Sequence, residues 1–200
     1  VLVPTYAKDE FRLTVEELEK KVTPKTKAIL IGYPNNPTGT IMDRASLEKV
    51  AAFAKAHDLI VIADEIYCDL TYEGQHTCFA SLPDMQERTI VLNGFSKSYA
   101  MTGLRIGYVC APREALEEIY KVHQYEILCA STTSQYGAIE ALRNCDDDVK
   151  AMFEEYAARR EMIYQGLVDI GLTVFKPKGA FYIFPDISCT GMNEEEFCDR

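Results

Sequence analysis

The sequence predicts an α/β fold: a three-layer, mostly parallel sheet with one antiparallel strand, followed by the start of a small α+β domain. Two observations predict this fold. Uninterrupted apolar runs are separated by helical patterns, which is typical of parallel strands buried on both faces. The last run also follows its predecessor too closely for a helical crossover, so we expect that pair to be antiparallel. The predicted strands are 27–33, 59–63, 89–92 and 106–110.

The composition narrows the class of protein. The chain of 200 residues is 48% apolar, which is ample for a core, but it contains no apolar stretch long enough to cross a bilayer. The net charge of −10 opposes general binding to nucleic acid, because phosphates repel an acidic surface. The seven cysteines include no CxxC pair and indicate reduced thiols in a cytoplasmic protein. No His or Cys spacing predicts a metal site.

Both ends of the chain indicate a piece of a longer polypeptide. Val1 is not an initiator methionine, and the residues after it form neither a signal peptide nor a transit sequence. At the other end, Asn193 is typical of the cap of a helix, and the chain stops at Arg200 within that element.

Helix signals lie around the first strands. Thr14 and Glu17 form a capping pattern for a short helix that ends near Lys20. Asp43 caps the next helix, whose apolar residues recur at helical spacing and predict a buried stripe. The stripe consists of Leu47, Val50, Ala51 and Ala54. We assign no helix to the loop-rich residues 68–88.

Three more helices are expected further along the chain. Pro112, at the first helical position, opens one that runs through Lys121, and the next covers 131–142. A long amphipathic helix covers 146–170, because aspartates favour its positive end and Gly171 ends it. Its apolar face consists of Val149, Met152, Phe153, Tyr156, Ile163 and Leu167.

The residues after this helix indicate the start of a second domain. A turn over 176–179 separates two short apolar segments, which predicts strands at 172–175 and 180–184. We therefore expect a large domain over 1–145, a connecting helix over 146–170 and the start of a small domain over 171–200.

Polar residues follow three of the predicted strands directly. Asn36 lies in the loop after the first, Asp64 ends the second and Lys97 follows the third. Because the carboxyl ends of neighbouring parallel strands meet at one edge of a sheet, we expect these side chains to converge. Taken singly, Asn36 is typical of a turn, Asp64 of a helix cap and Lys97 of the protein surface. Their convergence favours a binding site.

Lys97 and Arg105 suit a ligand that carries an aldehyde and a phosphate. A partly desolvated lysine loses proton affinity and becomes a nucleophile that can form a Schiff base. An arginine fork can hold a phosphate through two parallel hydrogen bonds. Pyridoxal 5′-phosphate carries both groups, so it is the cofactor that this pair predicts.

These residues lie in motifs that resemble those of the class I and II aminotransferases, the fold-type I enzymes that use pyridoxal phosphate. The matching stretches cover nearly the whole chain, in the order and at the spacing of the family. They are Asn36-Pro37-Thr38-Gly39, Asp64-Glu65-Ile66-Tyr67, Ser96-Lys97 through Arg105-Ile106-Gly107-Tyr108, and Gly179-Ala180-Phe181-Tyr182. The resemblance implies that 1–145 is the cofactor-binding large domain and that the Asn36–Pro37 peptide bond is cis.

The resemblance also implies a role for each matching residue. Lys97 would hold the cofactor as a Schiff base and carry the proton between substrate and cofactor. Asp64 would pair with the pyridine nitrogen, while Tyr67 and Asn36 would hydrogen-bond the ring oxygen. The implied phosphate ligands are Arg105 and Ser96.

The chain departs from the family pattern at two positions. Gly94 stands where many members have a serine, so one phosphate contact is missing or replaced, and Leu104 stands where many have a tryptophan. The family's glycine-rich phosphate loop and its cofactor-stacking aromatic residue fall before Val1, and its substrate-binding arginine falls after Arg200. We therefore expect this piece alone to be inactive and the full-length protein to be a homodimer.

The activity predicted for the full-length protein is transfer of an amino group between an amino acid and a 2-oxo acid. Two alternatives stay open: a pyridoxal phosphate lyase that cleaves a carbon–sulfur bond at Cβ, and the effector-binding domain of an aminotransferase-like transcription regulator. The substrate is also open, because nothing in the sequence distinguishes aspartate, alanine or aromatic amino acids.

Overall fold

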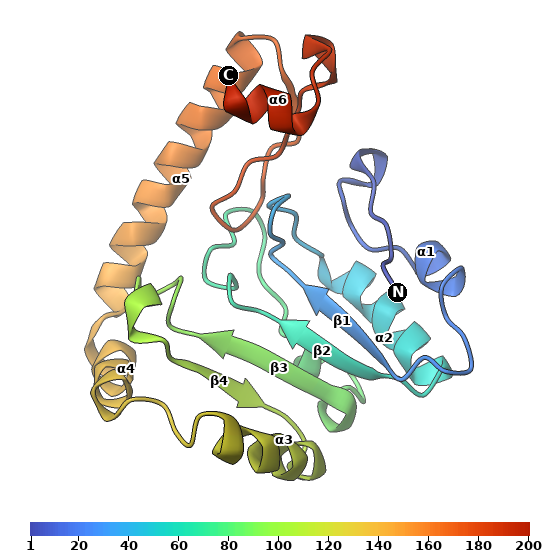
Figure 1. Cartoon of the computed structure of the whole chain (residues 1–200), viewed down its shortest axis with the longest axis vertical. Coiled ribbons are helices and arrows are strands. Elements are labelled where there is room, and N and C mark those ends of the chain that lie inside the picture. Colours follow the sequence, from blue (N-terminus) through green and yellow to red (C-terminus); the bar gives the residue numbers. More distant parts are fainter.

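The computed structural model describes residues 1–200 and contains a four-stranded mixed sheet in the order β1-β2-β3-β4 (Figure 1). Strands β1 (Ala28–Gly32), β2 (Ile60–Asp64) and β3 (Thr89–Gly94) are parallel, and β4 (Gly107–Cys110) is antiparallel to β3. All four coincide with predicted strands. The predicted fold class, including the antiparallel pair, is therefore confirmed.

The strand register brings the carboxyl ends of the parallel strands to one edge of the sheet. Gly32 at the end of β1 pairs with Asp64 at the end of β2, and Asp64 pairs with Leu92 in β3. The loops that follow these strands therefore leave from the same edge, which is where ligands bind in open α/β sheets.

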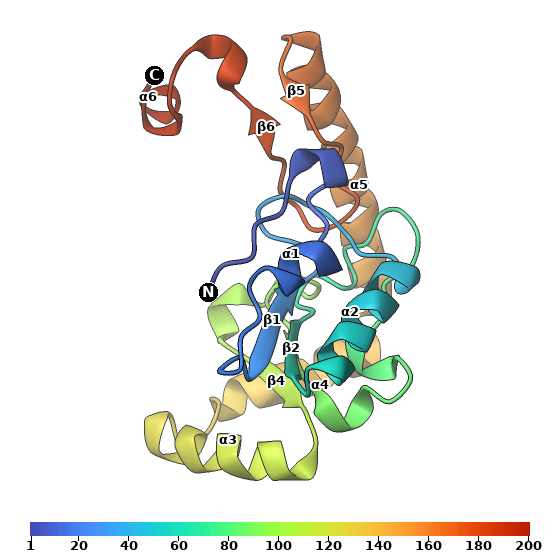
Figure 2. The same ribbon diagram turned by 90° about the vertical axis from the view of Figure 1, so that its right-hand side faces the viewer.

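Helix α2 (Arg44–Ala56) covers one face of the sheet (Figure 2). Asp43 caps it as predicted, because its Oδ1 accepts a hydrogen bond from the Ser46 amide at 2.7 Å. The predicted apolar stripe of α2 is buried in a core of 16 side chains, which removes that face of the sheet from water. The core comprises Leu13, Leu18, Ile29, Ile31, Met42, Leu47, Val50, Ala51, Phe53, Ala54, Leu59, Val61, Ala63, Phe79, Leu82 and Met85.

Short helical turns complete this part of the chain. Helix α1 (Val15–Glu19) begins after Thr14, whose Oγ1 accepts a hydrogen bond from the Glu17 amide at 3.4 Å, as the capping pattern predicts. Residues 68–88, for which no α-helix is expected, hold two 3₁₀ turns. The 3₁₀ turns of the chain are Ala7–Asp9, Phe79–Ser81, Gln86–Arg88, Thr102–Leu104 and Ser188–Thr190.

Helices α3 (Arg113–Glu126) and α4 (Thr132–Asn144) lie on the β4 side of the sheet (Figure 1). The prediction that Pro112 is the first helical residue is wrong, because its ψ of 149° is extended and the helix begins at the next residue. Helix α3 also continues beyond Lys121. Two alanines of α4 pack against Phe95, whereas α3 has no buried residue.

Helix α5 (Asp146–Asp169) rises from the sheet and leads to the C-terminal segment (Figure 1). Its bounds agree with the prediction to within one residue. None of its residues is fully buried, and Ile163 of the apolar face is 49% exposed. The upper part of α5 extends past the sheet and lies beside the C-terminal segment (Figure 1). Arg160 ties α5 to two loops, because its Nη1 donates to Glu73 Oε1 at 3.2 Å and to the Pro177 carbonyl at 3.0 Å.

The C-terminal segment contains the short antiparallel strands β5 (Thr173–Val174) and β6 (Pro185–Asp186). The predicted strand 180–184 is wrong. Its backbone bonds to the loop after β2 instead, since the Ala180 amide donates to the Leu70 carbonyl at 2.8 Å. The segment ends in α6 (Glu194–Asp199), which Asn193 caps as predicted. No helix of the structure is both long and apolar enough to cross a membrane.

Candidate active site

The loop after β1 holds Asn36 in a tightly bonded turn. The Asn35 amide donates to the Thr40 carbonyl at 2.9 Å, and the Thr38 hydroxyl donates to Asn35 Oδ1 at 2.9 Å. The Asn36–Pro37 peptide bond is cis, as expected, and so is the Tyr33–Pro34 bond. The turn presents the exposed Asn36 side chain at the edge of the sheet where β2 and β3 also end.

Gly39 joins this turn to the C-terminal segment. Its carbonyl accepts hydrogen bonds from the amides of both Lys178 and Gly179 at 2.9 Å. Its φ of +69° is left-handed, and a Cβ added there would lie 2.3 Å from Cβ of Pro177. Only glycine fits both restraints. The Asn36 loop and the residues that precede Phe181 are thus held against each other.

Lys97 follows β3 and is half-buried beneath two aromatic rings. Its Nζ lies 5.6 Å from the ring centroid of Tyr67 and 5.5 Å from that of Phe181, and it makes no ion pair. The two rings meet edge to face, with centroids 5.3 Å apart. The amine is therefore partly shielded from water and is not held by a carboxylate, as a lysine nucleophile requires.

Tyr67 connects these side chains. It is 6% exposed, and its hydroxyl oxygen lies 2.6 Å from that of Tyr182. Burial raises the pKa of Tyr67, the Tyr182 hydroxyl and the charge of Asp64 add to the rise, and the Asn36 side chain opposes it. Tyr182 is the residue whose side chain hydrogen-bonds Tyr67.

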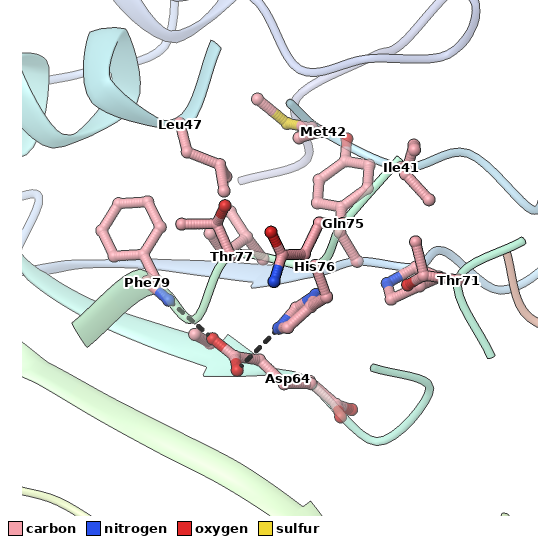
Figure 3. Close-up of a pocket in the computed structure, with 14 residues that line it drawn as sticks. Ile41, Met42, Leu47, Asp64, Thr71, Gln75, His76, Thr77 and Phe79 are labelled. Atoms are coloured by element: carbon pink, nitrogen blue, oxygen red, sulfur yellow. Dashed lines mark hydrogen bonds and ion pairs between the residues drawn. The ribbon is translucent and has the colours of Figure 1, made fainter. Parts of the chain in front are cut away.

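Asp64 is the last residue of β2, and its Oδ1 accepts a hydrogen bond from the Ile66 amide at 3.1 Å. Glu65 follows it and is 6% exposed. The dashed lines in Figure 3 run from this carboxylate to the Phe79 amide, at 2.8 Å, and to His76 Nε2, at 2.9 Å. These two bonds fasten the loop beside Asp64 to the end of β2.

The pocket in Figure 3 lies beside Asp64 and is lined in part by His76 and Thr71. Its volume is about 20 Å³, which is room for about one water molecule. It is therefore too small to be a cofactor pocket. Lys97 and the two aromatic rings above it do not line this pocket.

Arg105 and Ser96 lie in the turn between β3 and β4. The Thr102 hydroxyl donates to the Ser96 carbonyl at 3.0 Å, and Arg105 Nη1 donates to the Thr102 carbonyl at 2.9 Å. Arg105 is exposed, and its φ is +50°. The predicted phosphate ligands are thus linked to each other through Thr102, and they lie on either side of Lys97 in the chain, Ser96 directly before it and Arg105 after it.

The aromatic residues Phe181 and Tyr182 are absent from the predicted set of site residues. Their segment matches a family motif, but their contacts with Lys97 and Tyr67 come from a distant part of the chain. The motif was the only sequence signal that pointed to them.

The chain is similar to known proteins over its whole length. Residues 1–200 match the family described as Aminotransferase class I and II. The chain is 47% identical over 202 residues to aromatic-amino-acid aminotransferase 2 of Thermococcus litoralis, and 48% identical over 202 residues to an aspartate aminotransferase of Pyrococcus abyssi. Both alignments cover 100% of this chain and 52% of the relative, so the chain spans about half the length of these curated relatives.

The fold is similar to that of solved structures as well. The crystal structure of an aromatic aminotransferase from Pyrococcus horikoshii OT3 superposes with a TM-score of 0.97 at 47% identity. The similarity covers 100% of this chain and 54% of that one. The backbone of the whole chain, including the part around Lys97, therefore has the fold of a solved aminotransferase structure.

Proposed function

Because this chain belongs to the class I and II aminotransferases, we propose that the natural polypeptide carrying it transfers an amino group between an amino acid and a 2-oxo acid, with pyridoxal 5′-phosphate as cofactor. The observation that supports this most directly is the placement of Lys97, half-buried under two aromatic rings and free of any carboxylate. The acid and amide groups that would complete the site are Asp64, at the end of β2, and Asn36, in the loop after β1.

The side chains present suit this cofactor. The unpaired amine of Lys97 suits an aldehyde, since a Schiff base needs a free nitrogen. Arg105 donates one hydrogen bond, to Thr102, so the remaining N–H groups of its fork can receive a phosphate. Ser96 lies in the same turn. When bound, the cofactor supplies a protonated ring that accepts electrons from the substrate's Cα.

The residues of the chain would then divide the work. Asp64 would keep a proton on the ring nitrogen, because a carboxylate beside that nitrogen favours its charged form. Tyr67 and Asn36 would hydrogen-bond the ring oxygen. The amine of Lys97 would take a proton from the substrate's Cα and deliver it to C4′ of the cofactor.

The wider setting belongs to the same proposal. We infer a cytoplasmic homodimer, with a large domain over 1–145, a connecting helix over 146–170 and the start of a small domain over 171–200. The two relatives named above are aminotransferases of aromatic amino acids and of aspartate. Both substrate classes are therefore candidates for this chain.

Reductive trapping tests the proposal. The natural polypeptide is incubated with pyridoxal phosphate, reduced with borohydride and digested, and the pyridoxyl group is located by mass spectrometry. We expect the label on Lys97. The label on another lysine, or on none, would show that the proposed site is wrong.

A variant adds a kinetic test. Lys97→Ala removes the nucleophile and the proton carrier together, so amino-group transfer should fall by at least about 10⁴-fold. The matched control is Lys55→Ala, which removes a surface lysine that pairs with Asp84, and it should leave the rate unchanged. Retained transfer in the Lys97 variant would remove Lys97 from the mechanism.

A further inference from the structure

Tyr182 reaches the site from the C-terminal segment, 115 residues away in sequence from its partner Tyr67. The two hydroxyl oxygens are 2.6 Å apart, and the rings meet edge to face with centroids 5.6 Å apart. The backbone before Tyr182 is fixed by the Ala180–Leu70 hydrogen bond and by the bonds to the Gly39 carbonyl. The short contact is therefore built into the way the two segments pack.

The hydroxyl pair limits where the protons can point. Each phenol has one proton to donate, and only one of the two can donate across the 2.6 Å contact. If Tyr67 donated to Tyr182, it would have no proton left for another acceptor. If Tyr182 donates, the proton of Tyr67 is free. Tyr67 is 6% exposed, so bulk water has little access to it.

The surroundings favour the second arrangement once the cofactor is bound. Lys97 Nζ lies 5.6 Å from the centre of the Tyr67 ring, and under the proposed function Tyr67 would hydrogen-bond the ring oxygen of a cofactor held by Lys97. That oxygen carries negative charge and is a stronger acceptor than a neutral phenol. Tyr182 is only half-buried and has no second hydrogen-bond partner within the chain, so its own proton is available to Tyr67.

We propose that Tyr182 is a positioning residue of the amino-transfer site: its hydroxyl donates to Tyr67 and thereby directs the Tyr67 proton to the ring oxygen of the cofactor. The inference rests on the function proposed above. It assigns Tyr182 no contact with substrate or cofactor. Tyr182 acts through Tyr67 alone.

The variant Tyr182→Phe tests this, because it removes the hydroxyl and keeps the ring. On the natural polypeptide we would measure the Kd for pyridoxal phosphate and the pH midpoint of the visible absorbance of the bound cofactor. Loss of one hydrogen bond should weaken the Kd by about threefold to tenfold. The midpoint should rise, because a less well bonded ring oxygen holds the proton of the neighbouring Schiff-base nitrogen more strongly.

Three further variants separate positioning from packing. Tyr156→Phe removes a hydroxyl from the same aromatic cluster, where Tyr156 packs on Phe181 at 5.5 Å without a hydrogen bond, and both readouts should match those of the unmodified protein. Tyr67→Phe should raise the midpoint more than Tyr182→Phe does. The double variant at 67 and 182 should show no more than the effect of Tyr67→Phe alone, because Tyr182 has nothing left to direct.

The outcomes are distinguishable from those of the proposed function. If borohydride places no label on Lys97 of the unmodified protein, the proposed function and this inference are both wrong. If the label is on Lys97 but Tyr182→Phe leaves Kd and midpoint unchanged, only the inference is wrong. It is also overturned if the effects of the two substitutions simply add, or if Tyr156→Phe shifts the midpoint as far as Tyr182→Phe.

Discussion

Helices α2 and α3 are nearly equal in length, 13 and 14 residues, and both sequences place apolar residues at helical spacing. Yet α2 buries five residues, while α3 buries none and leaves Tyr120 62% exposed. The difference follows from topology. Helix α2 is the crossover between two parallel strands, so its stripe faces the sheet that those strands form, whereas α3 follows the antiparallel strand at the edge. An amphipathic pattern predicts a helix, and the surrounding sheet decides whether the apolar face is covered.

The residues of the candidate site come both from the side of the sheet that α2 covers and from the β4 side, and the two sides support them differently. Asn36 and Asp64 follow or end strands that pack on the 16-residue core, and Gly39 holds the Asn36 loop against the C-terminal segment. Arg105 lies on the β4 side, is exposed and makes one hydrogen bond within the chain. The side chains proposed to orient the cofactor ring thus extend from a well-packed part of the fold, while the proposed phosphate contact has fewer restraints.

The largest expected effect is a difference in the free energy of unfolding between a substitution in the 16-residue core and one in α4. Leu59 is 1% exposed beside β2, and Leu142 in α4 is 60% exposed. Leu59→Ala should lower the free energy of unfolding by about 3–5 kcal/mol, because it removes buried methyl groups and leaves a cavity. Leu142→Ala, the same substitution at an exposed position, should cost about 0.5 kcal/mol. Urea denaturation measures both losses, and equal losses would contradict the conclusion that the core contributes more stability than the surface of α4.

A smaller loss of stability is expected where the Asn36 loop meets the C-terminal segment. Gly39→Ala should cost about 3 kcal/mol, since it combines a left-handed backbone with a clash against Pro177. Gly171→Ala is the matched control, because Gly171 has a φ of +89° and no atom within 4 Å of an added Cβ. It should cost about 1 kcal/mol. Thermal unfolding of the two variants tests this, and a milder effect at Gly39 would mean that the junction is not tight.

The smallest effect concerns the start of α2. Hydrogen bonds from Ser46, chiefly from its amide, hold the pKa of Asp43 below its usual value. Asp43→Ala should destabilise the protein by about 1 kcal/mol at neutral pH, whereas Asp43→Asn should keep the cap. Because the folded pKa is lowered, the charge-dependent part of this stability is present above the unfolded pKa of about 3.9 and is lost as pH falls through the folded pKa.

Urea denaturation at neutral and acid pH checks the sign. Stability should fall less steeply in acid for the Asp43→Asn variant than for the unmodified protein. The difference should be small, because the Asp43 side chain is 58% exposed. A steeper fall in the Asn variant would contradict the assignment of the cap.

Much of the fold could be predicted because its signals are local. Uninterrupted apolar runs identified all four strands, and the Thr14, Asp43 and Asn193 caps identified three helix starts. The strand 180–184 was predicted wrongly for the same reason. Its apolar residues resemble a strand locally, but its backbone bonds to Leu70 and its neighbours bond to Gly39, which no local pattern reveals.

The candidate site divides along the same line. The position of Lys97, Asp64 and Asn36 after successive strands could be derived from the sequence, because parallel strands must align their carboxyl ends. The placement of the Phe181 ring over Lys97 and of Tyr182 against Tyr67 could not be derived, because both residues come from beyond α5 in the chain.

By itself, the sequence determined which segments become strands and helices and which polar residues follow the strands, since both depend on spacing along the chain. Only the tertiary structure decided which apolar faces are buried and which tyrosine meets Tyr67. The reason is physical: burial and a 2.6 Å contact between hydroxyls depend on where distant segments come to lie in space, and hydrophobic packing against the sheet sets that arrangement.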